Sequence, residues 1–397
     1  MRRAALFAIL VRCSPPEETP GGAAEPPVGT TEPEPEPEPD PEPDPDPPIT
    51  AACDIDPADG QAAIIAAIAA CPEGSTVRFP LGASYTVDSA ITVEDRVDLV
   101  IDGNGATFHN VAPNDDATSP TFALRRATNV TLRNLTVEGS FLPTGGRLGA
   151  AGETVRSTNQ FNPAVLVYGG QGVWIEDVTA NHVWGDGVLV VPSDAVLPGD
   201  PGAGSRATDI HVVRLKATTH SRQCVGVADV DGLWIEFSTC VDSWYGGVDL
   251  EPDRGVVTHV IHDAHVLDNT FDGYWGYAVA VPTDVDTGQV EGVEIRGNVT
   301  LTPPDICFAP VLVVYHEAGT PETPGTTVAD IVVEDNVLLT QGDGVSIRDA
   351  SSGSVRYNTI ELTESPTWCG SVADPSVPVR RLGADGVTVS DNMVIGF

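Results

Sequence analysis

A short phrase recurs along this chain from about residue 97 to residue 397. In each copy, branched apolar residues alternate with polar ones, a turn that often contains Asn follows, and a second apolar strand comes after the turn. Clear copies occupy residues 129–139, 172–183, 231–241, 292–301, 329–339, 353–362 and 385–397. Repetition on this scale indicates one supersecondary unit stacked many times, because a single unit cannot bury its own apolar face.

The spacing of the copies separates two kinds of repeat architecture. Equivalent apolar positions at Leu132, Ile175, Val212 and Ile235 lie 43, 37 and 23 residues apart. A short coil that carries insertions of varying length is typical of a solenoid, whereas a β-propeller needs an even spacing of roughly 40–50 residues per blade. We therefore predict an all-β chain that folds as a parallel β-helix.

One amphipathic segment precedes the first coil. Residues 59–70, DGQAAIIAAIAA, combine a capping residue, Asp59, with many alanines and an apolar stripe of Ile64, Ile65 and Ile68. We predict a short α-helix that covers the open apolar end of the first coil, which otherwise meets water.

The segment after this helix resembles the start of a known superfamily. The matching residues are Val77, Phe79, Pro80, Gly82, Tyr85, Val87 and Asp102-Gly103-Asn104-Gly105. With the repeats, the chain resembles the pectin lyase-like superfamily of right-handed parallel β-helix proteins over about residues 53–397. That superfamily includes polysaccharide lyases, glycoside hydrolases, carbohydrate esterases and epimerases, and also non-catalytic adhesins. The resemblance therefore implies the fold and leaves the activity open.

The first 50 residues have a different composition. Residues 1–13 begin with Met1-Arg2-Arg3 and a short apolar run, as an export signal does. Leu10-Val11-Arg12-Cys13 resembles the lipidation site of bacterial lipoproteins, with Arg12 in place of a small residue. Residues 14–50 are rich in Pro, Glu and Asp, which predicts a disordered, extended linker. Residues 51–397 then form the β-helix domain. This order predicts an exported bacterial protein that is either secreted or held at the cell surface or outer membrane through Cys13.

Cysteine usage supports export. The chain has seven cysteines, and six remain when Cys13 is set aside. Six cysteines in an exported domain allow three disulfides in 15 connectivities. We expect Cys53 to pair with Cys71, because the two bracket the predicted helix. Cys224 is either a buried thiol in the stack or part of a bridge.

The charge of the chain excludes several partners. The formal net charge is −37, and Lys216 is the only lysine. Such a surface repels nucleic acid and anionic membranes, so we expect membrane contact only through the lipid anchor. A polyanionic substrate is disfavoured unless a metal cation bridges the two. We expect a monomer.

Alignment of successive strands predicts a pair of outward carboxylates. When residues 187–191, 224–228, 247–251 and 277–281 are stacked, Asp249 and Glu251 point outward between small neighbours. Residues i and i+2 of a strand lie roughly 6.5–7 Å apart. That spacing is compatible with the carboxylate pairs of glycosidases. Asp253 extends the row, although paired acids are also common as solvated surface groups.

The turns before these strands carry polar and aromatic residues. In chain order they are His182, Trp184, Asp186, His220, Arg222, Gln223, Trp244, Tyr245 and Trp275. Aromatic rings beside carboxylates suit a sugar-binding groove, in which ring faces contact C–H surfaces and polar groups bind hydroxyls. The alternative is an aromatic ladder that only stabilises the solenoid.

We therefore predict an exported protein that acts on a polysaccharide or oligosaccharide, as a glycoside hydrolase rather than a lyase. In a hydrolase, one of Asp249, Glu251 and Asp186 acts as acid and another as base or nucleophile. Arg222 and His220 then orient the substrate.

In a lyase, Arg222 or His220 abstracts a proton, and Ca²⁺ held by Asp249, Glu251 and Asp253 neutralises a uronate. No other cofactor is predicted. A non-catalytic surface module that binds glycans or other cells is the alternative from another class.

Overall fold

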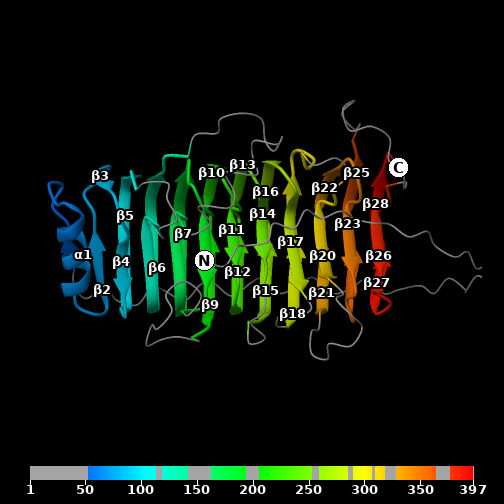
Figure 1. The fold of residues 1–397 in the computed structure, drawn as a ribbon, viewed down its shortest axis with the longest axis horizontal. Coiled ribbons are helices and arrows are strands. Elements are labelled where there is room, and N and C mark those ends of the chain that lie inside the picture. Colours follow the sequence, from blue (N-terminus) through cyan, green and yellow to red (C-terminus); the bar gives the residue numbers. More distant parts are fainter. Residues whose placement is uncertain are drawn as a thin grey trace, which may run out of the picture. The chain divides into compact units, whose positions relative to one another are not determined.

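The computed structural model describes residues 52–112, 119–141, 162–193, 205–252, 259–284, 289–305, 309–317, 328–363 and 376–396. In these ranges the strands pair in parallel from coil to coil, and each coil has three strand-bearing faces. Figure 1 shows the coils following one another from the helix α1 to the strands β26, β27 and β28.

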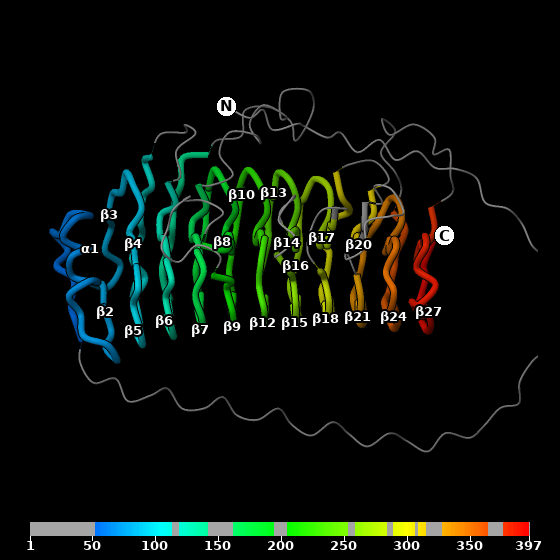
Figure 2. The backbone as a smooth tube through the Cα atoms, turned by 60° about the horizontal axis from the view of Figure 1, so that its bottom comes forward, coloured from blue at the N-terminus to red at the C-terminus, as the bar shows by residue number. Residues whose placement is uncertain are grey.

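The first face consists of β4 (Ile91–Glu94), β8 (Val188–Val191), β11 (Val225–Val227), β14 (Gly246–Leu250), β17 (Tyr277–Asp284), β20 (Leu312–Glu317), β23 (Val345–Arg348) and β26 (Val379–Leu382). The second face consists of β1 (Ala52–Asp54), β2 (Ser75–Arg78), β9 (Ala207–Val213), β12 (Val230–Glu236), β15 (Ile261–Leu267), β18 (Val290–Arg296), β21 (Val328–Glu334), β24 (Gly353–Arg356) and β27 (Val387–Ser390). It runs along the lower edge of the stack in Figure 2.

The third face consists of β3 (Ser84–Val87), β10 (Lys216–His220), β13 (Thr239–Ser243), β16 (Thr270–Tyr274), β19 (Val299–Thr300), β22 (Val337–Thr340), β25 (Thr359–Leu362) and β28 (Met393–Ile395). Three long strands, β5 (Val97–Asn110), β6 (Phe122–Glu138) and β7 (Val165–Asn181), turn corners and contribute to more than one face. The predicted parallel β-helix with a short N-terminal α-helix is confirmed.

The core is a set of apolar columns that run through successive coils. On the first face Val188, Val225 and Val248 are paired in register, and all three are almost completely buried. This is the inward column predicted from the alternation of apolar and polar residues. The strand register therefore agrees with the alignment on which the candidate site depends.

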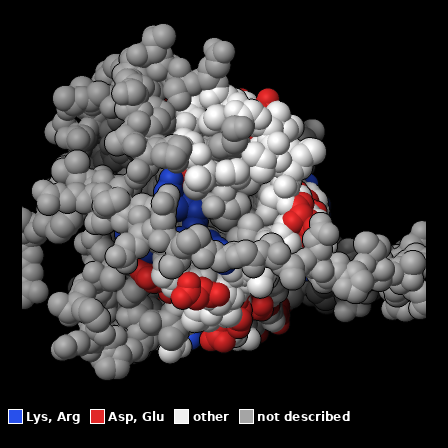
Figure 3. Space-filling model, turned by 90° about the vertical axis from the view of Figure 1, so that its right-hand side faces the viewer, with Lys and Arg blue, Asp and Glu red and all other residues white. Residues whose placement is uncertain are grey.

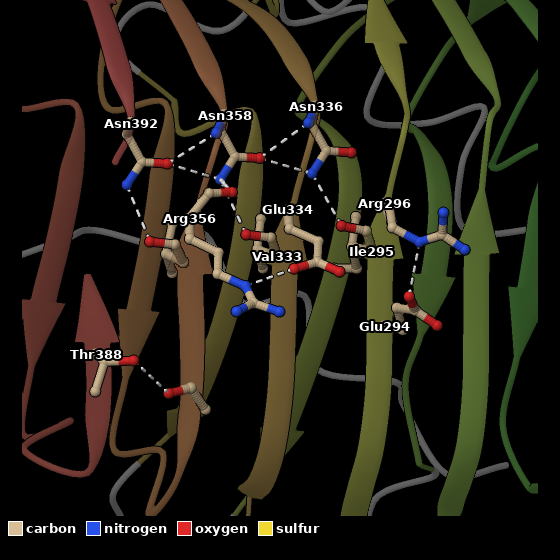
Figure 4. A network of polar contacts seen from close by, with 12 residues as sticks. Glu294, Ile295, Arg296, Val333, Glu334, Asn336, Arg356, Asn358, Thr388 and Asn392 are labelled. Carbon is tan, nitrogen blue, oxygen red and sulfur yellow. Dashed lines mark hydrogen bonds and ion pairs between the residues drawn. The ribbon is translucent and has the colours of Figure 1, made fainter. Parts of the chain in front are cut away.

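A ladder of asparagines, all buried except the last, joins the coils at the start of the third face. It comprises Asn269, Asn298, Asn336, Asn358 and Asn392. At each step the side-chain oxygen of one Asn accepts hydrogen bonds from the backbone and the side chain of the Asn in the preceding coil (Figure 4). Each Nδ2 also donates to a backbone carbonyl, such as that of Ile295 for Asn336. Buried turn groups are thus satisfied without water.

The helix α1 (Gln61–Ala70) covers the first coil, with Ile64 and Ile68 buried against it. The predicted cap by Asp59 is wrong, because the N-cap residue is Gly60 and no side chain caps the helix. The Asp59 carboxylate instead accepts the backbone N–H of Asp56 at 3.0 Å. A local turn before the helix therefore uses the acceptor that the sequence pattern assigned to the cap.

The opposite end of the stack is closed differently. Arg381 of β26 is paired with Ile347 of β23, so it stands in an inward column that is apolar in the preceding coils. Its guanidinium donates to the Val387 carbonyl at 2.7 Å. Figure 3 looks from the side of this end and shows basic side chains among uncharged ones. A charge therefore stands where the next coil of core would begin.

Two disulfides occur in the described residues. Cys53 is bonded to Cys71 across α1, as predicted, and Cys224 is bonded to Cys240, which resolves the alternative left open for Cys224. Cys13, Cys307 and Cys369 lie outside the described residues, as do the predicted export signal and linker. Among the residues described, no helix is long and apolar enough to cross a membrane.

Candidate active site

The predicted carboxylates lie where the third face turns into the first. Asp186 and Gln223 stand in equivalent turns of neighbouring coils. Tyr277 is in register with Gly246, which belongs to the coil between that of Gln223 and that of Tyr277. Asp249 follows three residues after Gly246 and is in register with Gly226. Stacking of three or four coils thus brings together residues that are up to about 90 positions apart in the chain.

Two glycines make room for these side chains. A Cβ added to Gly246 would lie 2.2 Å from the ring of Tyr277, so only glycine lets that ring lie across β14. A Cβ on Gly226 would lie 3.1 Å from the Asp186 Oδ2 atom. The space beside Gly226 is therefore flanked by Asp186 on one side and by Asp249 on the adjoining strand.

Asp249 is held by two donors from different coils. Its Oδ2 atom accepts hydrogen bonds from Gln223 Nε2 at 2.6 Å and from the Tyr277 hydroxyl at 2.9 Å. Its Oδ1 atom is buried and has no hydrogen-bond partner among the described residues. Burial, reinforced by the charge of Glu251, raises the pKa of Asp249 to about 8. The carboxyl group is thus mainly protonated at neutral pH.

Asp186 is completely buried. Its Oδ1 atom accepts the backbone N–H of Gln223 at 2.9 Å and lies 3.5 Å from Arg222 Nε. Its Oδ2 atom, which faces Gly226, has no hydrogen-bond partner in the described part of the chain. Burial raises the pKa of Asp186 to about 6, although Arg222 opposes that shift.

Arg222 links the acidic groups electrostatically. Its Nε atom donates to Gln223 Oε1 at 2.9 Å. Burial lowers the pKa of Arg222, but Asp186, Asp249 and Glu251 together more than offset this, so that pKa lies above its ordinary value. Arg222 therefore stays charged and serves as counter-ion to several carboxylates.

The comparisons with known proteins bear on the fold. No family model matches the chain, and no curated protein matches it. The solved structure of an endo-xylogalacturonan hydrolase from Aspergillus tubingensis is 14% identical with a TM-score of 0.55, over 86% of this chain and 95% of that one. The Streptococcus pneumoniae surface adhesin PfbA is 12% identical with a TM-score of 0.49, over 84% and 85%.

The tailspike of the E. coli bacteriophage HK620 is 12% identical with a TM-score of 0.49, over 86% of this chain and 63% of the tailspike chain. This domain has the parallel β-helix fold. The likeness to the endo-xylogalacturonan hydrolase shows the fold alone, so the activity has to be argued from the site itself.

The aromatic residues of this β-helix domain form two groups beside the carboxylates. In one group Phe141 contacts Trp184 and Trp244, with ring centroids 4.9 and 5.4 Å apart. Trp244 is only 6% exposed, so it belongs to the packing of the turn rather than to a subsite. Trp184 is partly exposed and donates from Nε1 to Ser140 Oγ.

The second aromatic group is closer to Asp249. Tyr245 lies 5.9 Å from Trp275 and 5.7 Å from Tyr277, measured between ring centroids. Tyr245 and Trp275 are partly exposed, and Tyr277 bonds Asp249 directly. Tyr245, Trp275 and Gln223 are therefore the predicted substrate-binding residues that this turn groups with the acid.

Two predicted histidines do not join the carboxylates. His220 is completely buried and is in register with Ser243, which is followed in the next coil by buried Tyr274. The burial of His220 argues against the predicted role of this side chain in orienting a polysaccharide. His182 bonds Glu138 through Nδ1 at 2.5 Å on the third face and lies outside the hydrogen-bonded group around Asp249.

The rest of the predicted row is incomplete in the structure. Glu251 is half-buried. Its backbone N–H donates to the Val227 carbonyl and so continues the backbone hydrogen bonds between the two coils. Asp253 lies outside the described residues, and with it part of the predicted calcium set. Within the described ranges no group of three or more His, Cys, Asp or Glu residues is arranged to hold a metal ion.

Sequence reasoning missed Tyr277 and Phe141. Tyr277 starts β17, which stacks on β14. Its position opposite Gly246 is the signal that its aromatic ring crosses the neighbouring strand. Phe141 follows β6 without any repeat pattern, and we find no feature of the sequence that predicts its contacts.

Proposed function

We propose that this domain is a glycoside hydrolase that cleaves a neutral polysaccharide, with Asp249 and Glu251 as its catalytic carboxyl groups. The observation that carries the proposal is the state of Asp249, a buried carboxyl with a pKa of about 8, two residues before Glu251 on the same outward row. A carboxyl that keeps its proton at neutral pH can protonate a glycosidic oxygen. A nearby carboxylate can then act as base or nucleophile.

The spacing of the two groups supports this division of roles. Outward residues two apart on a strand are separated by roughly 6.5–7 Å between their Cα atoms. Carboxyl pairs of retaining and inverting glycosidases lie about 5–9.5 Å apart. Gln223 and Tyr277 hold the Asp249 Oδ2 atom, which leaves Oδ1 for proton transfer.

The lyase alternative loses the two bases that the sequence suggested for it. The raised pKa of Arg222 keeps its guanidinium protonated, so it is a poor proton acceptor. His220 is completely buried. The net charge of −37 also disfavours a polyuronate substrate.

A non-catalytic glycan-binding module is the second candidate, and the burial of the acids favours it. Asp186 is 0% and Asp249 3% exposed, whereas a hydrolase must bring its acid to the substrate. In that reading, the acidic cluster only holds the turns of adjacent coils together.

The test is to incubate the protein with arabinoxylan, xyloglucan, mixed-linkage β-glucan, galactomannan and polygalacturonate, with and without Ca²⁺. We expect reducing ends from a neutral chain. Asp249→Asn and Glu251→Gln should each lower the rate about 10²- to 10⁴-fold. Matched controls are Asp231→Asn and Glu291→Gln, which remove exposed carboxylates from the second face.

Three outcomes contradict the hydrolase. No release from any of the five chains removes the enzymatic reading. Unsaturated products that require Ca²⁺ indicate a lyase. Binding without turnover, retained in both variants, indicates the non-catalytic module.

For the segment before the β-helix, we propose export and anchoring through a lipid on Cys13. Two disulfides in the described residues support an oxidising compartment. In cells fed a labelled fatty acid, label should appear in the protein and disappear in Cys13→Ala. An unlabelled wild-type protein that is released into the medium contradicts the anchor.

A further inference from the structure

A stack of four rings lies on the outer surface of the second face. Trp174, His211, Trp234 and His265 are in register on β7, β9, β12 and β15. The successive centroids are 3.6, 4.6 and 5.4 Å apart, and the interplanar angles are 4°, 8° and 12°. The strand spacing of roughly 4.8 Å therefore sets the spacing of the rings.

The two ends of the stack differ. At one end His265 is held by Glu294 at 2.9 Å and by Asp263 at 3.1 Å. At the other end the register partner of Trp174 on β6 is Thr131, which has no ring. Trp174 is 36% exposed, whereas Trp234, with a ring on each side, is only partly exposed. The outer face of the Trp174 indole is thus the open end of the stack.

The open face has the dimensions of one missing ring. A planar group placed above Thr131 would lie one strand spacing from Trp174, at roughly 4.8 Å, which is within the range of the ring spacings below it. The residue one strand further along, Val100 of β5, is also too small to fill the position. His211 packs flat against the inner face of the indole and holds its plane.

Polar groups surround this position. Arg133 is diagonal to Trp174 in the β6–β7 ladder and is half-buried beside Asp102 at 3.4 Å. Glu176 is the next outward residue after Trp174 on β7, and exposed Gln171 precedes Trp174 by three residues. The Arg133 guanidinium disfavours a cationic ligand over the indole, and the net charge of −37 disfavours a polyanion.

We propose that the outer face of Trp174 binds one pyranose ring of a neutral glycan chain, which takes the place of a fifth ring in the stack. A flat, fixed apolar face beside hydroxyl-binding side chains is the arrangement that sugar C–H surfaces fit. The site is on the second face and shares no residue with the Asp249 group. The inference therefore does not depend on the proposed hydrolase.

The test is native affinity electrophoresis through gels that contain arabinoxylan, xyloglucan, mixed-linkage β-glucan or galactomannan, with polygalacturonate as the charged comparison. The protein carries Asp249→Asn throughout, so that turnover does not remove the ligand. We expect retardation by at least one neutral chain. Trp174→Ala should weaken the apparent affinity about three- to tenfold, the range of one aromatic contact.

Thr131→Leu is the decisive variant. It keeps Trp174 but places an aliphatic side chain against the open face of the indole without creating a new ring face, so binding should be lost while the melting temperature stays close to that of the parent. Phe237→Ala is the control, because Phe237 is an aromatic residue outside the stack that is 58% exposed. The proposal is overturned if no neutral chain retards the protein. It is also overturned if Thr131→Leu binds as well as its parent, or if Phe237→Ala loses as much affinity as Trp174→Ala.

Discussion

The Tyr277 hydroxyl donates a hydrogen bond to Asp249 Oδ2 at 2.9 Å across the boundary between two coils. This bond favours the charged form of Asp249 and so opposes the rise in its pKa that burial causes. Tyr277→Phe keeps the ring over Gly246 but removes the donor. We expect the pKa of Asp249 to rise above its value of about 8, as measured by a ¹³C NMR titration of the aspartate carboxyl groups. A pKa that stays the same or falls would contradict this role of the hydroxyl.

Two buried acids should make this protein less stable as pH rises, whereas acid denaturation makes proteins less stable as pH falls. The pKa is raised to about 8 for Asp249 and to about 6 for Asp186, both above the value of about 3.9 of an unfolded Asp. The contribution of the two acids to the free energy of unfolding is complete below the unfolded pKa. It is lost as pH rises through the pKa values of the folded protein.

Urea unfolding at several pH values tests this linkage. Between about pH 4 and 8, the free energy of unfolding of the wild type should fall relative to that of Asp249→Asn by up to about 1.4 kcal/mol per pH unit. The free energy of unfolding of Asp385→Asn, which changes an exposed residue and keeps both buried acids, should fall with pH as that of the wild type does. Parallel curves for wild type and Asp249→Asn would mean that Asp249 is ionised in the folded protein at neutral pH.

The asparagine ladder predicts an uneven cost of truncation along the stack. Asn336→Ala leaves the Ile295 carbonyl and the backbone and side-chain donors of Asn298 without their partner in a buried turn. We expect a loss of about 3 kcal/mol or more in the free energy of unfolding. Asn392→Ala, at the half-buried end of the ladder, should cost about 1 kcal/mol. Equal losses at the two positions, measured by urea unfolding, would show that the ladder does not act through buried groups.

The Cys224–Cys240 disulfide closes a loop with a sequence separation of 16, close to the 18 of Cys53–Cys71. In the chain-entropy model, replacing either pair by alanine should therefore cost a similar amount, about 3 kcal/mol. Reductant should destabilise the wild type and have no further effect on a variant that lacks both pairs. A wild type whose melting temperature is insensitive to reductant would contradict the contribution of both disulfides.

The alternation of apolar and polar residues was sufficient to predict the faces of the strands. Val188, Val225 and Val248 share a column because a period of two repeats in each coil, and a parallel stack leaves little freedom of register once the core side is known. The outward position of Asp249 follows from the same alternation. Its burial does not, because an outward side chain can be covered by neighbours that no local pattern reveals.

The alternation fails at corners. Thr219 has a left-handed backbone with φ of 51°, and so have His182 at 53° and Asp242 at 55° in the equivalent turns. Such a residue breaks the period of two, so the next residue, His220 in one coil, turns inward. A reading that carries the strand pattern through the turn assigns His220 to the wrong side.

The ring stack could have been predicted from the repeats. Ile175, Val212 and Ile235 are equivalent apolar positions, and the residues before them are Trp174, His211 and Trp234. Outward aromatic residues at one position of consecutive coils must stack, because neighbouring strands are roughly 4.8 Å apart. The prediction requires comparison of outward positions along the second face as well as the first.

The guanidinium of Arg381, exposed at the C-terminal end of the stack, has a consequence for self-assembly. The strands β26, β27 and β28 form an edge, and an edge of this kind is a template on which a second copy can add. Two such edges brought together would enclose two like charges in one dry interior. Arg381 therefore opposes the pairing of two copies through this edge, which repetition of the apolar columns would favour.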